Sequence, residues 1–527
     1  MPMLDWIGKD KVINHHNDVP YRGLDRQYSY DSNGQTATDN DSSNMIIQGD
    51  NLEALKSLLP RYEGKIKCIY IDPPYNTGNE NWIYNDNVNS PQIQKWLGKV
   101  VGAESNDLTR HDKWLCMMYP RLKLLHKLLA DDGYIFVSLD FQNESAYFRC
   151  ICDEIFGSNN FIGELTWEST TQPINSGTAK FGLQQKVEPI FLYCKNKQKK
   201  STFLLKPIEN NLKYPHNGKF GKCRFEIIEK SDAGDYNRPT MKFPILGQFP
   251  RKGKRWQIGQ ETANFLEKNG RLEIVDGIVK RAIYPEDELD KIKYEPFWSH
   301  FPANEFGTAQ TGKEILNAIM GKSIGFDTVK PPSLIESLLS HFDKNAIILD
   351  SFAGSGTTAH AVLNLNKSDG GNRKFILIEM LDYAEDITAE RVKRVIKGYG
   401  EGKKAVDGTG GNFSFYKLGE QLLIDDELNE NLPLDTIRKY IWFTETRTDY
   451  LQPDNENPYF LGDLFNTDYY FYYEKDRLTT LNKDFLATFN RANEEYLIYA
   501  DICTLSDEQL LRYNITFKKI PRDITKF

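Results

Sequence analysis

The sequence has no run of 18 apolar residues and no Cys-x-x-Cys pair. A membrane-spanning helix needs about 20 apolar residues, so we expect no such segment. The stretch Met1–Trp6 lacks the basic and apolar regions of a secretory signal, and we therefore expect a cytoplasmic protein. Seven cysteines are scattered along 527 residues, and nearby histidines do not complete a zinc-binding spacing. The pattern predicts free thiols in a reducing compartment and no metal site.

The chain also lacks the excess of positive charge that nucleic-acid-binding proteins often carry, since its net charge is −8. This charge is unevenly distributed. Residues 171–310 contain 24 basic and 16 acidic side chains, whereas residues 411–527 contain 13 basic and 21 acidic ones. A basic segment within an acidic chain suits a DNA-facing module, because phosphate neutralisation supplies much of the affinity for DNA. A solvated, lysine-rich surface explains the same charge equally well.

One short stretch combines features that favour a polar site. Apolar residues 68–71 lead directly into Asp72-Pro-Pro-Tyr75, and Asn-Thr-Gly follows. The two prolines fix φ and remove two N–H donors, so the carbonyls and the flanking side chains are held stiffly. A flat, amino-bearing ring could lie on Tyr75 while its amino group donates hydrogen bonds to Asp72 and to a proline carbonyl. The alternative is an ordinary turn after a strand.

A second stretch, Asp350–Thr358, predicts a turn between a strand and a helix. Gly354 and Gly356 would allow a ligand to approach the main chain closely. With Ala359 the spacing satisfies G-x-G-x-x-A, and Glu379 ends the next predicted strand, where it could bind ribose hydroxyls. This is also the dinucleotide fingerprint, so an NAD-dependent enzyme is an alternative. The turn lacks Gly-Lys-Ser/Thr, which argues against a phosphate-binding P-loop.

Hydrophobic periodicity predicts alternating strands and helices on both sides of the basic segment. Both motifs lie at predicted carboxyl ends of strands, where open α/β sheets bind ligands. We expect polar loops at 29–44 and 79–110, a flexible connector at 399–411 and a β-rich insert in the basic segment. The predicted strands are 45–50, 65–71, 131–139 (with its turn), 346–350 and 375–379; the predicted helices are 51–59 (capped by Asp50 or Asn51), 113–130, 144–156, 330–341, 357–365 and 384–397.

These motifs resemble those of a known family. Asp72-Pro-Pro-Tyr75 looks like the catalytic motif of amino-group DNA methyltransferases, and Phe352-Ala-Gly-Ser-Gly-Thr357 resembles their S-adenosylmethionine motif. The order of catalytic motif, basic insert and cofactor motif resembles the β class of adenine-N6 DNA methyltransferases. Within that class the chain is similar to the modification (Mod) subunits of type III restriction–modification systems. Further similar stretches are 47–55, 118–122, 135–140, 155–161, 328–334 and 515–524.

The resemblance implies a Rossmann-like α/β methyltransferase sheet with a circularly permuted motif order. It also implies a division of the chain into five parts. These are an N-terminal arm and loop (1–44), a catalytic half (45–165), a target-recognition domain (166–310), an S-adenosylmethionine-binding half (311–400), and a linker with a C-terminal α+β domain (401–527).

The resemblance further implies how the site works. Asp72 and the Pro73 carbonyl would accept the two N6 hydrogens of a flipped-out adenine, Tyr75 would stack on the base, and Pro74 completes the catalytic motif. Asp140 and Asn76 are weaker candidates. S-adenosylmethionine would be held by Asp50, Asn51, Lys330, Pro331, Asp350, Phe352, Ala353, Gly354, Ser355, Gly356, Thr357 and Glu379.

Partners implied by the resemblance are double-stranded DNA and a second copy of the chain, and a restriction (helicase–nuclease) subunit is an open question. Two alternative functions stay within the same fold. Cytosine-N4 methylation uses related chemistry, although Asp rather than Ser before Pro-Pro favours adenine. A DNA-recognition subunit could keep the fold without catalysis, although Asp72 and Tyr75 are intact here.

Overall fold

The computed structural model describes residues 3–40, 42–76, 91–103, 108–141, 143–172, 183–208, 213–233, 238–288, 293–326, 328–424, 427–448, 450–454, 457–488, 494–521 and 523–524. The chain forms two compact units, one made of Met1–Leu204 with Trp298–Phe527 and the other of Leu205–Phe297. We call them unit 1 and unit 2. Among the described residues, no helix is long and apolar enough to cross a membrane.

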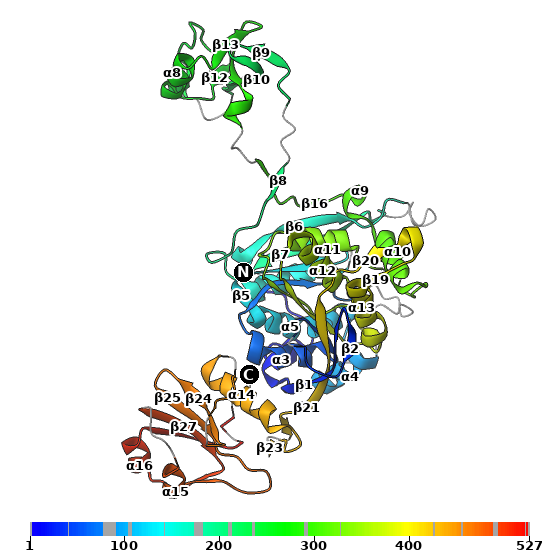
Figure 1. Ribbon diagram of the computed structural model, residues 1–527, viewed down its shortest axis with the longest axis vertical. Coiled ribbons are helices and arrows are strands. Elements are labelled where there is room, and N and C mark those ends of the chain that lie inside the picture. Colours follow the sequence, from blue (N-terminus) through cyan, green and yellow to red (C-terminus); the bar gives the residue numbers. More distant parts are fainter. Residues whose placement is uncertain are drawn as a thin grey trace. The chain divides into compact units, whose positions relative to one another are not determined.

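Unit 1 is built on an eleven-stranded mixed sheet, in the order β16-β6-β7-β5-β4-β17-β18-β3-β21-β1-β2 (Figure 1). Neighbouring strands from β5 to β21 are parallel, whereas β7 and β1 run antiparallel to their neighbours. The strands are β1 (Arg22–Asp31), β2 (Gly34–Thr36), β3 (Met45–Gln48), β4 (Ile66–Ile71), β5 (Leu129–Ser138), β6 (Phe161–Glu168), β7 (Val187–Cys194), β16 (His300–Phe301), β17 (Ile347–Asp350), β18 (Lys374–Glu379) and β21 (Asn412–Gln421).

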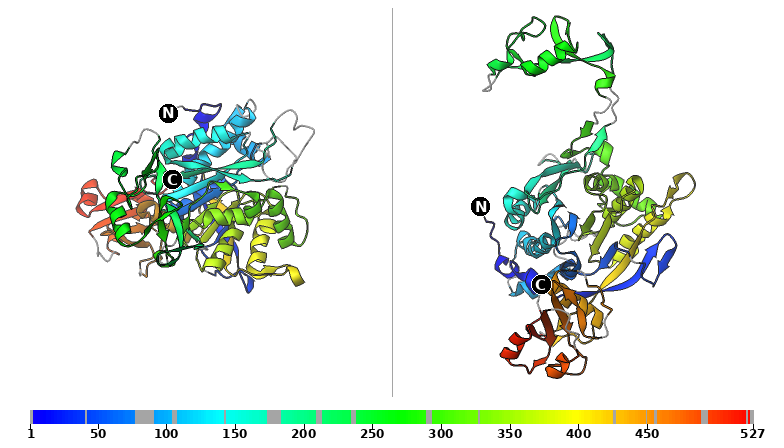
Figure 2. Two further views of the ribbon diagram at one scale, coloured as in Figure 1. Left: turned by 90° about the horizontal axis from the view of Figure 1, so that it is seen from above. Right: turned by 60° about the vertical axis from the view of Figure 1, so that its left-hand side comes forward.

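Helices cover both faces of the central strands (Figures 1 and 2). Ile69 and Ile71 of β4 pack in one core with the buried faces of α3 and α5. On the opposite face, Phe136 of β5 makes an edge contact with Phe342, which follows α11. The helices of unit 1 that matter here are α3 (Asn51–Tyr62), α5 (Arg110–Leu128), α6 (Ser145–Cys152), α10 (Ala309–Met320), α11 (Pro332–Leu339), α12 (Thr357–Asp369) and α13 (Glu390–Lys397).

The predicted central strands and helices are confirmed, with small changes at their ends. Asp50 caps α3 as expected, because its carboxylate accepts hydrogen bonds from the main-chain N–H groups of Leu52 and Glu53. α5 begins three residues earlier than predicted, after a capping box formed by Thr109 and Asp112. The predicted helices at 144–156 and 384–397 each contain a π-helical turn, at 153–157 and 384–389.

The predicted polar loop at 29–44 is wrong for residues 29–31 and 34–36, which lie in strands, whereas the other described residues of this stretch form no helix or strand. β1 and β2 form a hairpin, and β1 continues the main sheet by pairing with β21. The polar composition is compatible with burial here because the hydroxyl groups of Ser29 and Ser414 hydrogen-bond each other over 2.8 Å. Since β21 belongs to the same sheet, the predicted linker boundary at 401 also falls too early.

Part of the predicted loop at 79–110 is helical, whereas residues 79–90 lie outside the described residues. Helix α4 (Pro91–Val100) begins with a proline, which suits the first helical position. Its Leu97 is buried in the core of unit 1. The polar composition of this segment did not indicate a helix, because the helix contributes a single fully buried side chain among its described positions.

Unit 2 is smaller than the predicted insert of 166–310. β6, β7 and β16 belong to the main sheet, since β6 and β7 pair over their whole length. Unit 2 has its own core around the buried Trp256, whose indole N–H donates to the Phe243 carbonyl. Its elements are β8 (Lys206–Ile208), β9 (His216–Gly218), β10 (Gly221–Ile227), β11 (Glu229–Ser231), β12 (Lys254–Trp256), α8 (Gln260–Lys268), β13 (Leu272–Val275), β14 (Ile278–Ile283) and β15 (Lys293–Glu295).

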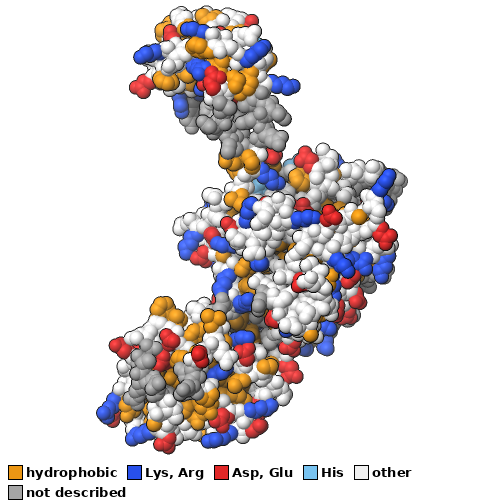
Figure 3. Space-filling view, in the orientation of Figure 1, with side chains coloured by type: hydrophobic (Ala, Val, Ile, Leu, Met, Phe, Trp, Pro, Cys, Tyr) orange, Lys and Arg blue, Asp and Glu red, His pale blue; other side chains and the backbone are white. Residues whose placement is uncertain are grey.

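The basic surplus of the insert is shared between the two units. Residues 205–297 contain 18 basic and 14 acidic side chains. Lys and Arg side chains lie on the visible face of unit 2 beside hydrophobic ones (Figure 3). The exposed hydrophobic side chains of this unit include Phe220, Ile227, Phe249, Phe265 and Ile274.

The C-terminal part of unit 1 forms a separate four-stranded sheet, in the order β24-β25-β27-β29. The aromatic stretch 469–473 lies largely in β25, where Tyr470 and Phe471 are buried. The elements are α14 (Leu434–Thr446), β24 (Phe460–Leu464), β25 (Thr467–Phe471), β27 (Glu495–Ala500) and β29 (Ile515–Lys519).

Candidate functional site

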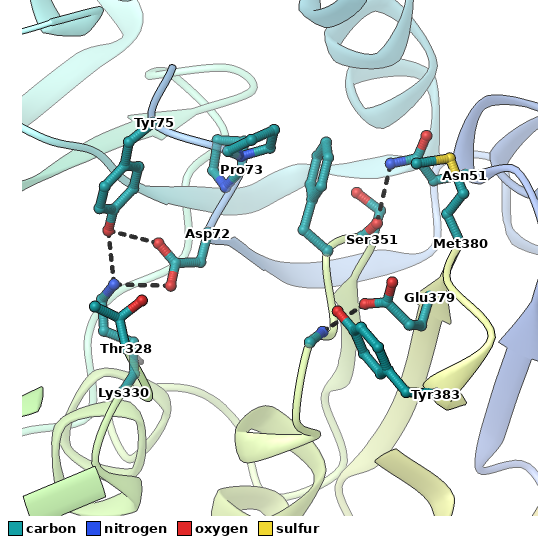
Figure 4. Close-up of a pocket in the computed structure, with 13 residues that line it drawn as sticks. Asn51, Asp72, Pro73, Tyr75, Thr328, Lys330, Ser351, Glu379, Met380 and Tyr383 are labelled. Carbon is teal, nitrogen blue, oxygen red and sulfur yellow. Dashed lines mark hydrogen bonds and ion pairs between the residues drawn. The ribbon is translucent and has the colours of Figure 1, made fainter. Parts of the chain in front are cut away.

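A pocket opens where β4, β17 and β18 end, and both sequence motifs contribute to its wall (Figure 4). β4 and β17 are neighbours in the sheet, so their carboxyl ends bring together residues almost 280 positions apart. The pocket is lined by Asn51, Asp72, Pro73, Pro74, Tyr75, Thr328, Lys330, Ser351, Phe352, Gly354, Glu379, Met380 and Tyr383.

One end of the pocket holds a network of charged and hydroxyl groups. The Tyr75 hydroxyl donates to Asp72 Oδ1 over 2.7 Å, and Lys330 Nζ donates to Asp72 Oδ2 over 2.7 Å. Lys330 Nζ also lies 2.6 Å from the Tyr75 oxygen. Glu188 of β7 lies 3.2 Å from the same hydroxyl and 3.4 Å from Lys330 Nζ. Asp72 is therefore held in place through both of its oxygens.

The Pro-Pro segment is fixed from behind by buried side chains. The indole N–H of Trp114 in α5 donates to the Pro74 carbonyl over 2.6 Å. Asn76 adopts a left-handed backbone (φ 59°), and its side-chain amide donates to the Arg110 carbonyl and to buried Glu144. Asparagine tolerates this backbone better than most residues. These contacts hold the motif on both sides of Tyr75.

The glycine turn after β17 is organised by two carboxylates. Asp350 accepts hydrogen bonds from the Phe352 N–H and from the Thr358 hydroxyl. Glu379 accepts one from the Gly354 N–H over 2.8 Å. Gly354 and Gly356 have φ of 51° and 81°, the left-handed region that favours glycine. The turn therefore presents main chain, rather than side chain, to the pocket at Gly354.

Burial changes the acid–base behaviour of these groups. It raises the pKa of Glu379 to about 7 and that of Asp350 to about 7, because both carboxylates are withdrawn from water. Burial, together with the adjacent Asp72 and Glu188, raises the pKa of Tyr75 well above its usual value. The Tyr75 hydroxyl consequently stays protonated and can act as a hydrogen-bond donor.

Asn51 forms another part of the wall and is fixed by a buried arginine. Arg121 Nε donates to Asn51 Oδ1 over 2.5 Å, and the Asn51 amide donates to the Ser351 carbonyl over 3.3 Å. The Ser351 hydroxyl is buried and makes no hydrogen bond within the described part of the chain. A buried hydroxyl without a partner is energetically unfavourable. The Ser351 hydroxyl therefore indicates that this part of the pocket binds a polar ligand.

Nine of the sixteen predicted site residues line the pocket, and the other seven lie behind it or beside it. Asp50 caps α3, Pro331 precedes α11, and Asp350 organises the glycine turn. The hydroxyls of Ser355 and Thr357 each accept a hydrogen bond of 2.8 Å from the buried Arg391. The seven are Asp50, Pro331, Asp350, Ala353, Ser355, Gly356 and Thr357. The weaker candidate Asp140 also lies outside the lining and binds Asn143 instead.

Sequence reasoning missed five residues of the site. Ser351 lies between the predicted residues Asp350 and Phe352, and Met380 directly follows Glu379, so both could have been included. Thr328 lies two positions before Lys330 in the same matching stretch. Tyr383 and Glu188 carry no local signal, because each reaches the site only through the folding of the sheet.

The arrangement suits the binding of two flat or extended polar groups side by side. The Asp72 end offers a carboxylate beside proline carbonyls, which accept hydrogen bonds from an amino group. The Glu379 end offers a carboxylate, a buried hydroxyl and the main chain of a glycine turn. Among the described residues, no group of three or more His, Cys, Asp or Glu side chains could hold a metal ion.

Comparisons with known proteins agree with this geometry. A family model described as DNA methylase (N6/N4) matches residues 66–390. The type III restriction-modification enzyme StyLTI Mod subunit of Salmonella typhimurium is 31% identical over 404 residues, which cover 71% of this chain and 57% of the relative. The EcoPI Mod subunit of Escherichia phage P1 is 30% identical over 454 residues, covering 75% of this chain and 68% of the relative.

A type II enzyme is also similar. The methyltransferase M.KpnI of Klebsiella pneumoniae is 32% identical over 405 residues, which cover 69% of this chain and 89% of the relative. The match of this chain thus spans little more than half of the StyLTI subunit but most of M.KpnI. The predicted resemblance and the predicted α/β methyltransferase fold are confirmed, and this chain belongs to the N6/N4 DNA methylase family.

Proposed function

We propose that this chain transfers a methyl group from S-adenosylmethionine to N6 of adenine in double-stranded DNA, as the modification component of a restriction–modification system. One observation carries the proposal. The Asp72 carboxylate and the Pro-Pro carbonyls lie in the same pocket as the glycine turn of β17, so an amino-group site and a cofactor-type site adjoin. The family match and the similarity to Mod subunits support it.

The residues at the Glu379 end fit S-adenosylmethionine. Its ribose hydroxyls need acceptors, which Glu379 offers, and its polar groups would satisfy the buried Ser351 hydroxyl. Phe352 and Met380 supply apolar surface beside these groups, and Asn51 supplies an oriented amide. When bound, S-adenosylmethionine supplies an electrophilic methyl group on a positively charged sulfur.

The residues at the Asp72 end would prepare the target nitrogen. The lone pair of an exocyclic amino group is delocalised into its ring, so it is a weak nucleophile. Asp72 and the Pro73 carbonyl, as acceptors for the two N–H bonds, would orient the nitrogen and draw its lone pair out of conjugation. Tyr75 would stack on the base, which must leave the duplex to reach this depth.

Adenine is the target that the residues favour, because the motif has Asp rather than Ser before Pro-Pro; cytosine N4 is the alternative. We propose unit 2 as the part that recognises DNA sequence, since it is a separate module with a basic surplus. The similarity to Mod subunits extends the proposal to two partners, a second copy of this chain and a restriction subunit.

Methyl transfer can be tested directly. The protein is incubated with S-adenosylmethionine labelled in its methyl group and with unmethylated bacterial DNA, and the modified base is identified after digestion. We expect label in N6-methyladenine, and we expect Asp72→Ala to abolish it. Label in N4-methylcytosine would select the alternative target. No transfer by the wild type, or undiminished transfer by Asp72→Ala, would contradict the proposal.

A further inference from the structure

The Tyr75 hydroxyl lies between two carboxylates. Its oxygen is 2.7 Å from Asp72 Oδ1 and 3.2 Å from Glu188 Oε2 (Asp72 and Tyr75 are seen in Figure 4). A hydroxyl has one hydrogen, so it donates to one of these two carboxylates at a time. The shorter distance indicates that Asp72 accepts it in this structure. Glu188 is a second acceptor within reach of the same group.

Lys330 holds this arrangement together. Its ammonium group contacts Asp72, the Tyr75 oxygen and Glu188, and its side chain is only 8% exposed. The Glu188 side chain is 14% exposed and comes from the second position of β7. Lys330 therefore keeps Glu188 close to Tyr75, and the carboxylates share one cation in a site with little water.

We propose that Glu188 is a positioning residue that takes over the Tyr75 hydrogen bond when the target amino group occupies Asp72 Oδ1. This inference rests on the proposed function. The change is a rotation of the hydroxyl about its C–O bond, in which no proton is transferred and no covalent bond is made or broken. Asp72 Oδ1 is thereby released to accept from the amino group, while the Tyr75 ring stays anchored.

The absence of this second acceptor would have a defined effect. Without Glu188, the Tyr75 hydroxyl keeps Asp72 as its acceptor and competes there with the amino group. This competition raises the energy of the complex in which the base is ready to react. The loss should therefore appear in kcat, whereas the affinity for S-adenosylmethionine should not change, because its proposed site lies at the other end of the pocket.

A double-mutant cycle with Tyr75→Phe tests the inference, because Phe keeps the ring and removes the hydroxyl. We expect Glu188→Ala to lower kcat about ten-fold, the value of roughly one lost hydrogen bond. We expect Glu188→Gln to retain most of the activity, since its amide oxygen still accepts. In the Tyr75→Phe background, Glu188→Ala should lower kcat by less than about two-fold, because the hydroxyl that it serves is gone.

The matched control is Glu164→Ala on the neighbouring strand β6, an exposed position that should leave kcat unchanged. Circular dichroism and calorimetric binding of S-adenosylmethionine verify that each variant is folded. The inference is overturned if Glu188→Ala keeps wild-type kcat, if Glu188→Gln is as impaired as Glu188→Ala, or if the loss persists in the Tyr75→Phe background. In each of these cases transfer by the wild type, abolished by Asp72→Ala, would leave the proposed function intact.

Discussion

Lys330 Nζ lies 2.7 Å from Asp72 Oδ2, although 258 positions separate the two residues in the chain. Lys330 precedes α11, whereas Asp72 follows β4, so this ion pair ties the two halves of unit 1 together at the pocket. Glu188 also contacts the ammonium group. Lys330 is thus a cation shared by two carboxylates, Asp72 and Glu188, at this end of the pocket.

Lys330→Met should therefore slow methyl transfer strongly and lower the stability of unit 1. Removing the cation leaves Asp72 and Glu188 facing each other in a poorly solvated site, and breaking a buried pair in this way costs about 3 kcal/mol. We expect the unfolding free energy in urea to fall by about that amount and kcat to fall at least about 100-fold.

Lys186→Met provides the matched control for this experiment. Lys186 binds Glu168 over 3.2 Å, but its side chain is 60% exposed, and such surface pairs contribute about 0–1 kcal/mol. The control should behave like the wild type. Equal stability of Lys330→Met and Lys186→Met would show that the buried pair does not stabilise unit 1.

Trp114→Phe tests the support behind the Pro-Pro segment. The substitution removes the indole N–H that binds the Pro74 carbonyl over 2.6 Å and leaves a gap at a fully buried position. We expect a loss of stability of about 2 kcal/mol, from the lost hydrogen bond and the reduced packing.

Activity should fall about ten-fold with unchanged binding of S-adenosylmethionine, because only the Asp72 end of the pocket is loosened. Trp256→Phe is the comparison, since Trp256 is equally buried and its indole N–H also binds a main-chain carbonyl, but it belongs to unit 2. A kcat for Trp114→Phe at the wild-type level would contradict the supporting role.

The buried carboxylates at the other end of the pocket predict a pH dependence of stability. The pKa of Glu379 is raised by burial from 4.5 to about 7. Between these values the folded protein holds a proton that the unfolded chain has released, so the unfolding free energy falls as the pH rises. Below and above this window the contribution of Glu379 is constant. Asp350 acts in the same direction, since its pKa is raised to about 7.

Glu379→Gln should make the unfolding free energy decline less between pH 5 and pH 7. The variant should also bind S-adenosylmethionine more weakly at pH 8, where wild-type Glu379 is ionised and accepts hydrogen bonds best. Urea titrations and calorimetric binding at pH 6 and pH 8 measure the two effects. A pH profile that is identical for wild type and variant would exclude Glu379 as the titrating group, with the exposed Glu164→Gln as control.

Gly356→Ala tests the glycine turn. Gly356 has φ 81°, and a Cβ atom there would meet both the methyl group and the carbonyl oxygen of Thr388 at 3.2 Å. We expect a loss of stability of about 2 kcal/mol, from the left-handed backbone and the crowding, and a several-fold loss of affinity for S-adenosylmethionine as the turn shifts.

Gly370→Ala separates the two causes in that prediction. Gly370 has a comparable φ of 67°, but a Cβ atom there would meet nothing within 4 Å. Gly370→Ala should lower the unfolding free energy by about 1 kcal/mol, because of backbone strain alone, and should keep the wild-type affinity for S-adenosylmethionine. An equal effect of both substitutions on affinity would show that crowding against Thr388 is not what matters.

The two motifs could be predicted from sequence because their chemistry is local. Asp72, the prolines and Tyr75 are consecutive, and the glycines of the turn are fixed by the strand that precedes them. Glu188 illustrates the opposite case. It is the second residue of a largely apolar strand, and only the antiparallel pairing of β7 with β5 and the position of Lys330 give it a role.

The predicted polar loop at 29–44 was wrong over residues 29–31 and 34–36 for a related reason. Ser29 is buried against Ser414, and no property of residues 29–44 indicates a partner strand almost 390 positions later. Ser355 and Thr357 were expected to line the pocket because they lie in the motif, but the buried Arg391 binds their hydroxyls instead. Local sequence therefore identified the motifs, while the direction of each side chain depended on distant partners.

The order of strands in the main sheet has a consequence for how the chain is made. β3 and β4 are separated in the sheet by β17 (Ile347–Asp350) and β18 (Lys374–Glu379), which follow β4 (Ile66–Ile71) far later in the chain. Until β17 and β18 leave the ribosome, the edges of β3 and β4 that pair with them are unpaired and apolar. Such edges promote aggregation. Such long-range pairing slows folding. The N-terminal third of this protein therefore depends on its own C-terminal half, or on a chaperone, to remain soluble during synthesis.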